Sequence, residues 1–206
     1  MVKREFRIFV EGGAKGDLKR RCREGFSKFF DKSGLKGNMP RVVACGSRRH
    51  AYDDFCVALA KARLGDVIVL LVDSEAPVNC EEDQVWEHVY LREGDKWPRP
   101  NDAEPAHLHF MVECMEAWFM ADKMCLEAYF GQGFETDKLP SRSDIEQIAK
   151  TDLYEGLKKA TKNCKTKACY GKGAHSFDIL GKIDPAKVIA ASPYAKRLID
   201  KLLINT

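Results

Sequence analysis

Residues 67–75 read VIVLLVDSE, six consecutive apolar residues followed by two acids on either side of a serine. A short, uninterrupted apolar run rich in Val, Ile and Leu is typical of a strand buried on both faces, as in a parallel sheet. Parallel strands need long crossovers, usually helices, so strands and helices should alternate around this run. The run therefore predicts an α/β fold with acidic side chains at the carboxyl end of a central strand.

The sequence before this run supplies the expected alternation. Apolar and aromatic residues predict strands at 6–11 and 41–45, and apolar residues at helical spacing predict helices at 15–30 and 51–63. The resulting order, strand-helix-strand-helix-strand, implies right-handed crossovers and a parallel core. In such open sheets, ligands bind at the carboxyl ends of the strands.

The sequence after the run has a weaker pattern. Residues 74–104 contain three prolines, Pro77, Pro98 and Pro100, and many charges, and Pro105 follows directly, so this segment is predicted to be a loop. A fourth strand is predicted at 108–112 and a helix at 113–122, although the same apolar spacing also fits one helix. Further short helices are predicted at 141–150, 153–161, 175–182 and 185–203, the last interrupted by Pro193. We therefore predict a Rossmann-like parallel sheet of about four strands in residues 1–122, with a helical extension packed on it in residues 123–206.

Composition limits the class of protein. The chain has 206 residues, of which 45% are apolar, so it suits one domain with at most a small appendage. No run approaches the roughly 18 apolar residues of a membrane span, and the charged start does not resemble a secretory signal. We expect a cytoplasmic protein whose eight cysteines are reduced thiols. Cys164, Cys169 and His175 offer three zinc ligands without an obvious fourth, so structural zinc is the less favoured interpretation.

Three acids are predicted to meet at the carboxyl edge of the sheet. Glu11 ends the first predicted strand, Asp73 follows the third, and Glu75 lies two residues further on. Side chains at i and i+2 share a direction on a strand, and three oxygen ligands suit Mg²⁺ or Mn²⁺. Each acid alone also fits a solvated strand end, but their joint placement favours a metal site.

A glycine pair, Gly12 and Gly13, follows the first acid and permits a sharp turn and close approach of a phosphate. The stretch GGAKGD also suggests a loop that binds a nucleotide, but it lacks both common phosphate-loop patterns. Asp17 either extends the carboxylate set or stabilises the helix dipole.

Glu116 is a further candidate for the site. Glu113 and Glu116 are spaced i, i+3 and so lie on one face of the predicted helix. Glu116 either completes the metal site, directly or by holding a ligand, or is a buried glutamate bonded to the backbone. Trp118 and Phe119, which follow closely, are predicted to belong to the core rather than to a base-stacking surface.

Basic residues near the predicted site are candidates for phosphate binding. Lys15 follows the glycine pair, and Arg48 follows the second strand, where a guanidinium would suit phosphate. Lys172 and His175 are further candidates, and His175 could also transfer a proton near neutral pH or cap a helix. The net charge is only +3, but residues 158–172 contain six lysines and no acid, which suits nucleic acid or a solvated face.

The two acidic strand ends resemble the Toprim superfamily. In that family a glutamate follows the first strand, usually with a glycine after it, and a D-x-D pair follows the third. Here RIFVEGGAKGD (7–17) and VIVLLVDSEAPV (67–78) match in type and order, except that Glu75 replaces the usual second Asp and could alter the metal spacing. The similarity extends over nearly the whole chain to a group of bacterial Toprim-like proteins of unknown function, akin to RloB, through the segments MVECMEAWFMAD, YFGQGF, KGAHSFDILGKIDPAKV and SPYAKRL.

The resemblance implies a Toprim-like fold and a metal-dependent nuclease. RloB-like and overcoming-lysogenisation-defect proteins are associated with cleavage of DNA or RNA, often beside an ATPase in defence against phage. Glu11, Asp73 and Glu75 would hold Mg²⁺ or Mn²⁺, and Glu116 matches the glutamate of the family's E-A-W segment. Two alternatives stay open: a non-catalytic subunit that binds nucleic acid or regulates an ATPase, and a small-molecule phosphohydrolase. Expected partners are nucleic acid, a separately encoded ATPase and a second copy of the chain, with no membrane.

Overall fold

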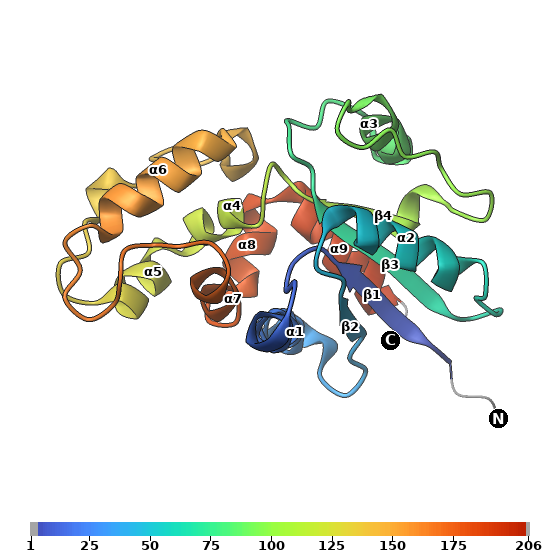
Figure 1. Ribbon diagram of the computed structural model, residues 1–206, viewed down its shortest axis with the longest axis horizontal. Coiled ribbons are helices and arrows are strands. Elements are labelled where there is room, and N and C mark those ends of the chain that lie inside the picture. The colour runs from blue at the N-terminus through green and yellow to red at the C-terminus, as the bar shows by residue number, and fades with distance from the viewer. Residues whose placement is uncertain (1–3, 205–206) are drawn as a thin grey trace.

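A four-stranded parallel sheet forms the centre of the molecule. In the computed structural model, which describes residues 4–204, the strands are β1 (Phe6–Val10), β2 (Arg41–Ala44), β3 (Val67–Asp73) and β4 (Leu108–Met111). Their order is β2-β1-β3-β4, and each neighbouring pair is parallel (Figure 1). The predicted α/β fold with a parallel sheet of four strands is therefore confirmed.

Both faces of the sheet are covered, which explains why β3 is apolar throughout. Residues 67, 69 and 71 pack with α1 (Gly16–Phe30) in one hydrophobic cluster. Residues 68, 70 and 72 pack on the opposite face with α2 (Arg48–Leu59) and α3 (Val85–Leu91). All seven residues of β3 are buried, as expected for a central parallel strand.

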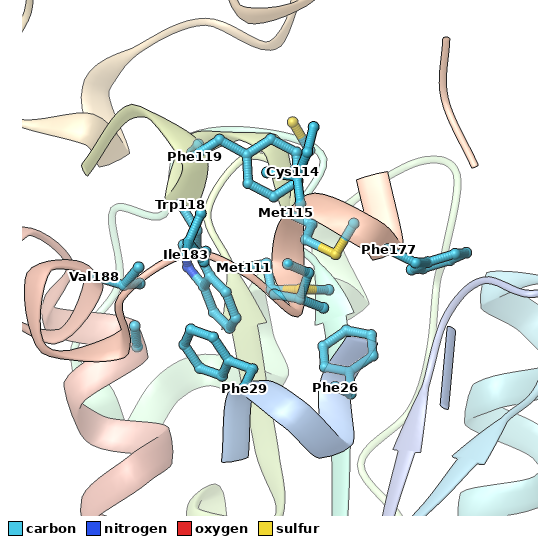
Figure 2. Close-up of a cluster of buried hydrophobic side chains, with 14 of the residues drawn as sticks. Phe26, Phe29, Met111, Cys114, Met115, Trp118, Phe119, Phe177, Ile183 and Val188 are labelled. Atoms are coloured by element: carbon cyan, nitrogen blue, oxygen red, sulfur yellow. The ribbon is translucent and has the colours of Figure 1, made fainter. Parts of the chain in front are cut away.

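An aromatic cluster joins the sheet to the C-terminal half of the chain. Phe29 of α1 stacks on Trp118 with ring centroids 5.1 Å apart, and both lie among the buried side chains of Figure 2. Trp118 belongs to α4 (Glu116–Phe119), and it and Phe119 are almost completely buried, which confirms them as core residues. Figure 2 also labels Phe177 at the edge of this region, next to Met115.

The C-terminal half consists of helices that share this core. They are α5 (Lys123–Phe130), α6 (Lys150–Thr161), α7 (Ala174–Leu180), α8 (Pro185–Ala191) and α9 (Pro193–Ile204). α7 packs on α1, where a Cβ at Gly25 would come within 2.5 Å of the Phe177 carbonyl oxygen. α5 and α6 lie furthest from the sheet in Figure 1. Pro193 begins α9, so the predicted interruption is present. Among residues 4–204, none of the helices combines the length and apolar character needed to span a membrane.

Three predicted elements were wrong in type or extent. Residues 74–104 are not only a loop, because they include α3, whose Val85, Trp86 and Val89 are buried against the sheet. The helix predicted at 141–150 is replaced by a single 3₁₀ turn, Ile145–Gln147, which the Asp144 side chain caps before Ile148 becomes extended. The helix predicted at 113–122 begins only at Glu116, so Glu113 does not share a helix face with it.

Candidate metal site and adjoining cavity

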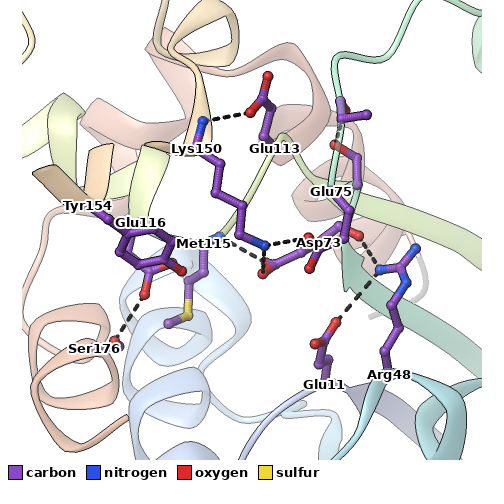
Figure 3. A network of polar contacts seen from close by, with 12 residues as sticks. Glu11, Arg48, Asp73, Glu75, Glu113, Met115, Glu116, Lys150, Tyr154 and Ser176 are labelled. Atoms are coloured by element: carbon purple, nitrogen blue, oxygen red, sulfur yellow. Dashed lines mark hydrogen bonds and ion pairs between the residues drawn. The ribbon is translucent and has the colours of Figure 1, made fainter. Parts of the chain in front are cut away.

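The structure brings Glu11, Asp73 and Glu75 together at the carboxyl edge of the sheet. One carboxylate oxygen from each lies within 4.8 Å of the others, and no other group of three such ligands is found among residues 4–204. The parallel pairing of β1 with β3 sets Val10 beside Leu71, and β3 continues two residues further to Asp73, so Glu11 and Asp73 lie at the same edge of the sheet. Figure 3 shows the three side chains approaching one another from these strand ends.

Asp73 is the most deeply buried of the three carboxylates. Its Oδ1 accepts a hydrogen bond of 2.9 Å from the backbone N–H of Met115, just before α4. Burial, followed by the negative charges of Glu11 and Glu116, raises the pKa of Asp73 well above its ordinary value. Bringing a cation to this carboxylate would therefore relieve an unfavourable concentration of charge.

Glu75 reaches the cluster through an unusual backbone conformation. Its φ of 63° lies in the left-handed region, which is uncommon for a non-glycine residue and is often found at functional sites. The backbone N–H of Glu75 donates to the Glu113 carbonyl oxygen at 2.9 Å, which holds this turn against the segment after β4.

Glu11 contributes an oxygen that lacks a hydrogen bond. Its Oε2 is buried and accepts none from residues 4–204, and its contact with the Arg48 guanidinium, at 3.6 Å, is an ion pair only. Burial raises the pKa of Glu11, with a smaller contribution from Glu75, while the charge of Arg48 opposes the shift. Buried polar atoms normally have partners, so this oxygen is a natural ligand for an added cation.

Lys150 contacts the carboxylate cluster and was not among the residues predicted from the sequence. Its Nζ lies 2.5 Å from Glu75 Oε2 and 3.9 Å from Asp73 Oδ2 (Figure 3). It begins α6, and its backbone N–H donates to Glu113 Oε2 at 2.6 Å, so main chain and side chain are both held. Burial opposes its charge, but the hydrogen bond to Glu75 and the charge of Asp73 outweigh burial and raise the pKa of Lys150. The sequence offered no signal for it, because Lys150 stood at the C-terminal end of the helix predicted at 141–150, where a lysine is favourable.

Arg48, predicted to bind phosphate, is engaged by the protein itself. Its Nε and Nη2 each donate to Asp95 at 2.7 Å, and its Nη1 donates to the Asp73 carbonyl oxygen. The guanidinium also lies 4.8 Å from the centre of the Trp97 ring. Arg48 therefore ties the segment between β3 and β4 to the carboxylate cluster.

Glu116 is completely buried and is surrounded by hydroxyl groups. Its Oε1 accepts from Tyr170 at 2.8 Å and from Ser176 at 3.0 Å, and its Oε2 accepts from Tyr154 at 3.0 Å. These donors come from α6, α7 and the loop between them. Glu116 thus organises the C-terminal helices beside the site, through side-chain hydroxyls rather than the backbone.

A cavity of about 260 Å³ adjoins the carboxylates. Glu11, Asp73 and Glu116 contribute acidic groups to its lining, and Lys172 contributes a cation. Much of the remaining wall is apolar and is formed by Leu18, Met111, Met115 and Phe177. The cavity therefore combines an acidic side with an apolar side.

Residues 10–203 match a family described as a domain of unknown function (DUF4276). The chain belongs to the DUF4276 family. No curated protein and no solved structure matches it. The match begins at the end of β1 and extends into α9, so the carboxylate cluster, Lys150 and the cavity all lie within the DUF4276 region.

The other residues predicted for the site of this DUF4276 protein differ in how close they lie to the carboxylate cluster and the cavity. Lys172 lines the cavity, with its Nζ 5.6 Å from the centre of the Tyr154 ring, whereas Lys15 is exposed and lies outside the lining. His175 packs edge-on to Phe130, with centroids 5.7 Å apart, and burial lowers its pKa. Asp17 pairs with arginines of its own helix. Cys164, Cys169 and His175 do not form a ligand group within residues 4–204.

The carboxylate cluster fits a hard divalent cation. All three candidate ligands are oxygens, which Mg²⁺ and Mn²⁺ prefer, and Glu11 Oε2 is buried without a hydrogen bond. Lys150 already places a positive charge beside two of the three carboxylates, so a bound ion must share these oxygens with the ammonium or displace it.

Proposed function

We propose that this DUF4276 protein is a Mg²⁺- or Mn²⁺-dependent nuclease whose metal ligands are Glu11, Asp73 and Glu75. The observation that carries the proposal is the convergence of three carboxylates at the carboxyl edge of a parallel sheet, with one buried oxygen lacking a hydrogen bond. The resemblance of both strand ends to Toprim domains supports the choice of phosphodiester chemistry. When bound, the ion would supply an activated water and stabilise negative charge on the phosphate.

The chain's own residues would position the substrate. Lys150 and Lys172 would contact the substrate phosphate, because Lys150 contacts the metal carboxylates and Lys172 lines the cavity. Arg48, held by Asp95, would keep Glu11 and the end of β3 in place. The lysine-rich segment 158–172 would add affinity for the phosphate backbone that does not depend on base sequence.

Replacing Glu11 with glutamine tests the proposal. Cleavage of DNA or RNA in Mn²⁺ should be lost, while affinity for nucleic acid should stay equal or rise because a negative charge has been removed. Glu127→Gln, at an exposed position of α5, is the matched control and should cleave like wild type. Equal cleavage by wild type and Glu11→Gln would contradict the proposed site.

A second candidate function is a non-catalytic subunit that binds nucleic acid or regulates an ATPase. It is favoured by one observation, that Lys150 and Arg48 already pair with the acidic cluster. The same assay separates the two, because a binding subunit would retain affinity in every variant and cleave in none, with or without the ATPase. A place beside an ATPase in phage defence is suggested by the resemblance alone.

A further inference from the structure

The cavity is assembled from segments far apart in the sequence. The turn after β1 provides Gly12 and Gly13, α1 provides Leu18, and α7 provides Phe177. A Cβ at Gly12 would lie 2.9 Å from the Phe177 ring, so a larger residue there would disturb this wall. The shape of the cavity therefore depends on the close packing of the glycine turn against Phe177.

The chemistry of the walls suits a flat, largely apolar ring. Met111 and Met115 offer polarisable sulfur atoms, and Phe177 offers an aromatic surface, all of which pack well against aromatic rings. Leu18 lines the same cavity and is 37% exposed, whereas Met111, Met115 and Phe177 are buried. A Cβ at Gly173, at the start of α7, would lie 3.4 Å from Leu18, so α1 and α7 meet beside it.

The acidic side of the cavity restricts where an anion can bind. Glu11, Asp73 and Glu116 would repel a phosphate placed inside, whereas Lys172 and a divalent ion on the carboxylates would attract it. Since the cavity shares Glu11 and Asp73 with the metal site, a ring in the cavity lies next to a phosphate at that site. A ring joined to a phosphate through a short sugar is a nucleotide.

The cavity also bears on whether that nucleotide is paired in a duplex or unpaired. Its volume of about 260 Å³ lies slightly below the range of about 300–1,000 Å³ typical of pockets for drug-sized ligands. A base held against the cavity walls cannot at the same time be stacked between its neighbours in a duplex. A base within a duplex would have to leave the stack to enter, at a cost of a few kcal/mol.

We infer that the cavity receives one unpaired nucleobase of the substrate strand, so that the protein acts on single-stranded, bulged or frayed nucleic acid in preference to intact duplex. The inference rests on the proposed function, because it uses the phosphate position at the carboxylate cluster. It adds the class of substrate, which the cluster alone does not specify.

The test uses short DNA containing 2-aminopurine, whose fluorescence rises when the base leaves its neighbours. One duplex carries the probe in a single-base bulge and the other carries it fully paired, with Ca²⁺ as the oxygen-binding ion to slow cleavage. Wild type should bind the bulged DNA about tenfold or more tightly than the paired DNA, because pairing and stacking need not be broken. Its fluorescence should also change on binding.

Leu18→Trp fills the entrance from a partly exposed position, and Ala14→Trp, at an exposed residue of the lining, is a second variant if the first does not fold. Both should lose the preference for the bulge while binding Mn²⁺ as wild type does. Leu203→Trp is the matched control, because Leu203 is 38% exposed and lies outside the lining. It should keep the preference.

Equal affinity of wild type for bulged and paired DNA would overturn the inference, as would a folded Leu18→Trp protein that keeps the preference. Preference for free mononucleotides over both DNAs would also overturn it and would indicate a small-molecule site. If the bulged base inserts but Mn²⁺ does not bind and nothing is cleaved, the inference stands and the proposed nuclease function fails. If Mn²⁺ binds and both DNAs are cleaved equally, the nuclease stands and the inference fails.

Discussion

Replacing Lys150 with methionine tests whether the protein's own ammonium group competes with a divalent ion for the carboxylate cluster. Methionine keeps much of the length of the side chain and removes the charge. Lys150 Nζ lies 2.5 Å from Glu75 and 3.9 Å from Asp73, so an ion bound by the same oxygens would lie close to a positive charge. We expect the variant to bind Mn²⁺ more tightly than wild type.

The magnitude follows from the distances. Two unit charges about 4 Å apart interact by about 4 kcal/mol at the effective dielectric constant of a protein surface, and the double charge of Mn²⁺ raises this to about 8 kcal/mol. The Lys150 side chain is 23% exposed and can turn toward solvent when an ion binds, so only part of this repulsion acts. A remaining penalty of about 1.4–2.8 kcal/mol corresponds to Mn²⁺ binding that is about ten to a hundred times tighter in Lys150→Met.

Calorimetric titration with Mn²⁺ measures this affinity, and thermal unfolding provides a second measurement. Without the ion, Lys150→Met should melt at a lower temperature than wild type, because Glu75 and Asp73 lose a cationic partner. Added Mn²⁺ should raise its melting temperature more than that of wild type. Lys159→Met is the control, since Lys159 lies on the same helix and pairs with Glu155 at an exposed position. A folded Lys150→Met protein that binds Mn²⁺ no more tightly than wild type would refute the reasoning.

Three further predictions concern the same region. The pKa of Asp73 is raised, so the folded protein binds a proton at Asp73 more strongly than the unfolded chain does. The stability that this group contributes therefore falls as the pH rises from about 3.8, the ordinary pKa, to the raised pKa of the folded state. Asp73→Asn should therefore stabilise the ion-free protein at neutral pH more than at acidic pH in denaturant titrations, while weakening Mn²⁺ binding; a loss of stability at neutral pH would contradict this. Tyr170→Phe removes a hydrogen bond to the buried Glu116 carboxylate and should lower the free energy of unfolding by about 1.5–3 kcal/mol, against a smaller effect for Tyr90→Phe at an exposed position. Replacing Lys162, Lys165 and Lys167 with Gln should make nucleic-acid affinity less dependent on salt, and an unchanged slope would show that these lysines form only a solvated face.

The sequence determined the central sheet because its signals are local. Six apolar residues in a row, VIVLLV, specify a strand buried on both faces wherever the rest of the chain lies. Once the strands are parallel, their carboxyl ends share an edge, so the convergence of Glu11, Asp73 and Glu75 could be predicted without coordinates. α3 was missed because its seven residues lie within a segment rich in proline and charge, where burial against the sheet rather than length stabilises a helix.

Only the tertiary structure decided which distant side chains complete the site. Lys150 lies 75 residues from Glu75 in the sequence, and its approach depends on how the start of α6 is held by Glu113, in the segment after β4. The hydroxyl groups around Glu116 come from three C-terminal segments, and Asp95 reaches Arg48 from the excursion between β3 and β4. Periodicity reports which face of an element is buried, but it carries no information about which other element covers that face. The positions of the carboxylates were therefore determined locally, whereas their counter-charges and the adjoining cavity were determined by packing.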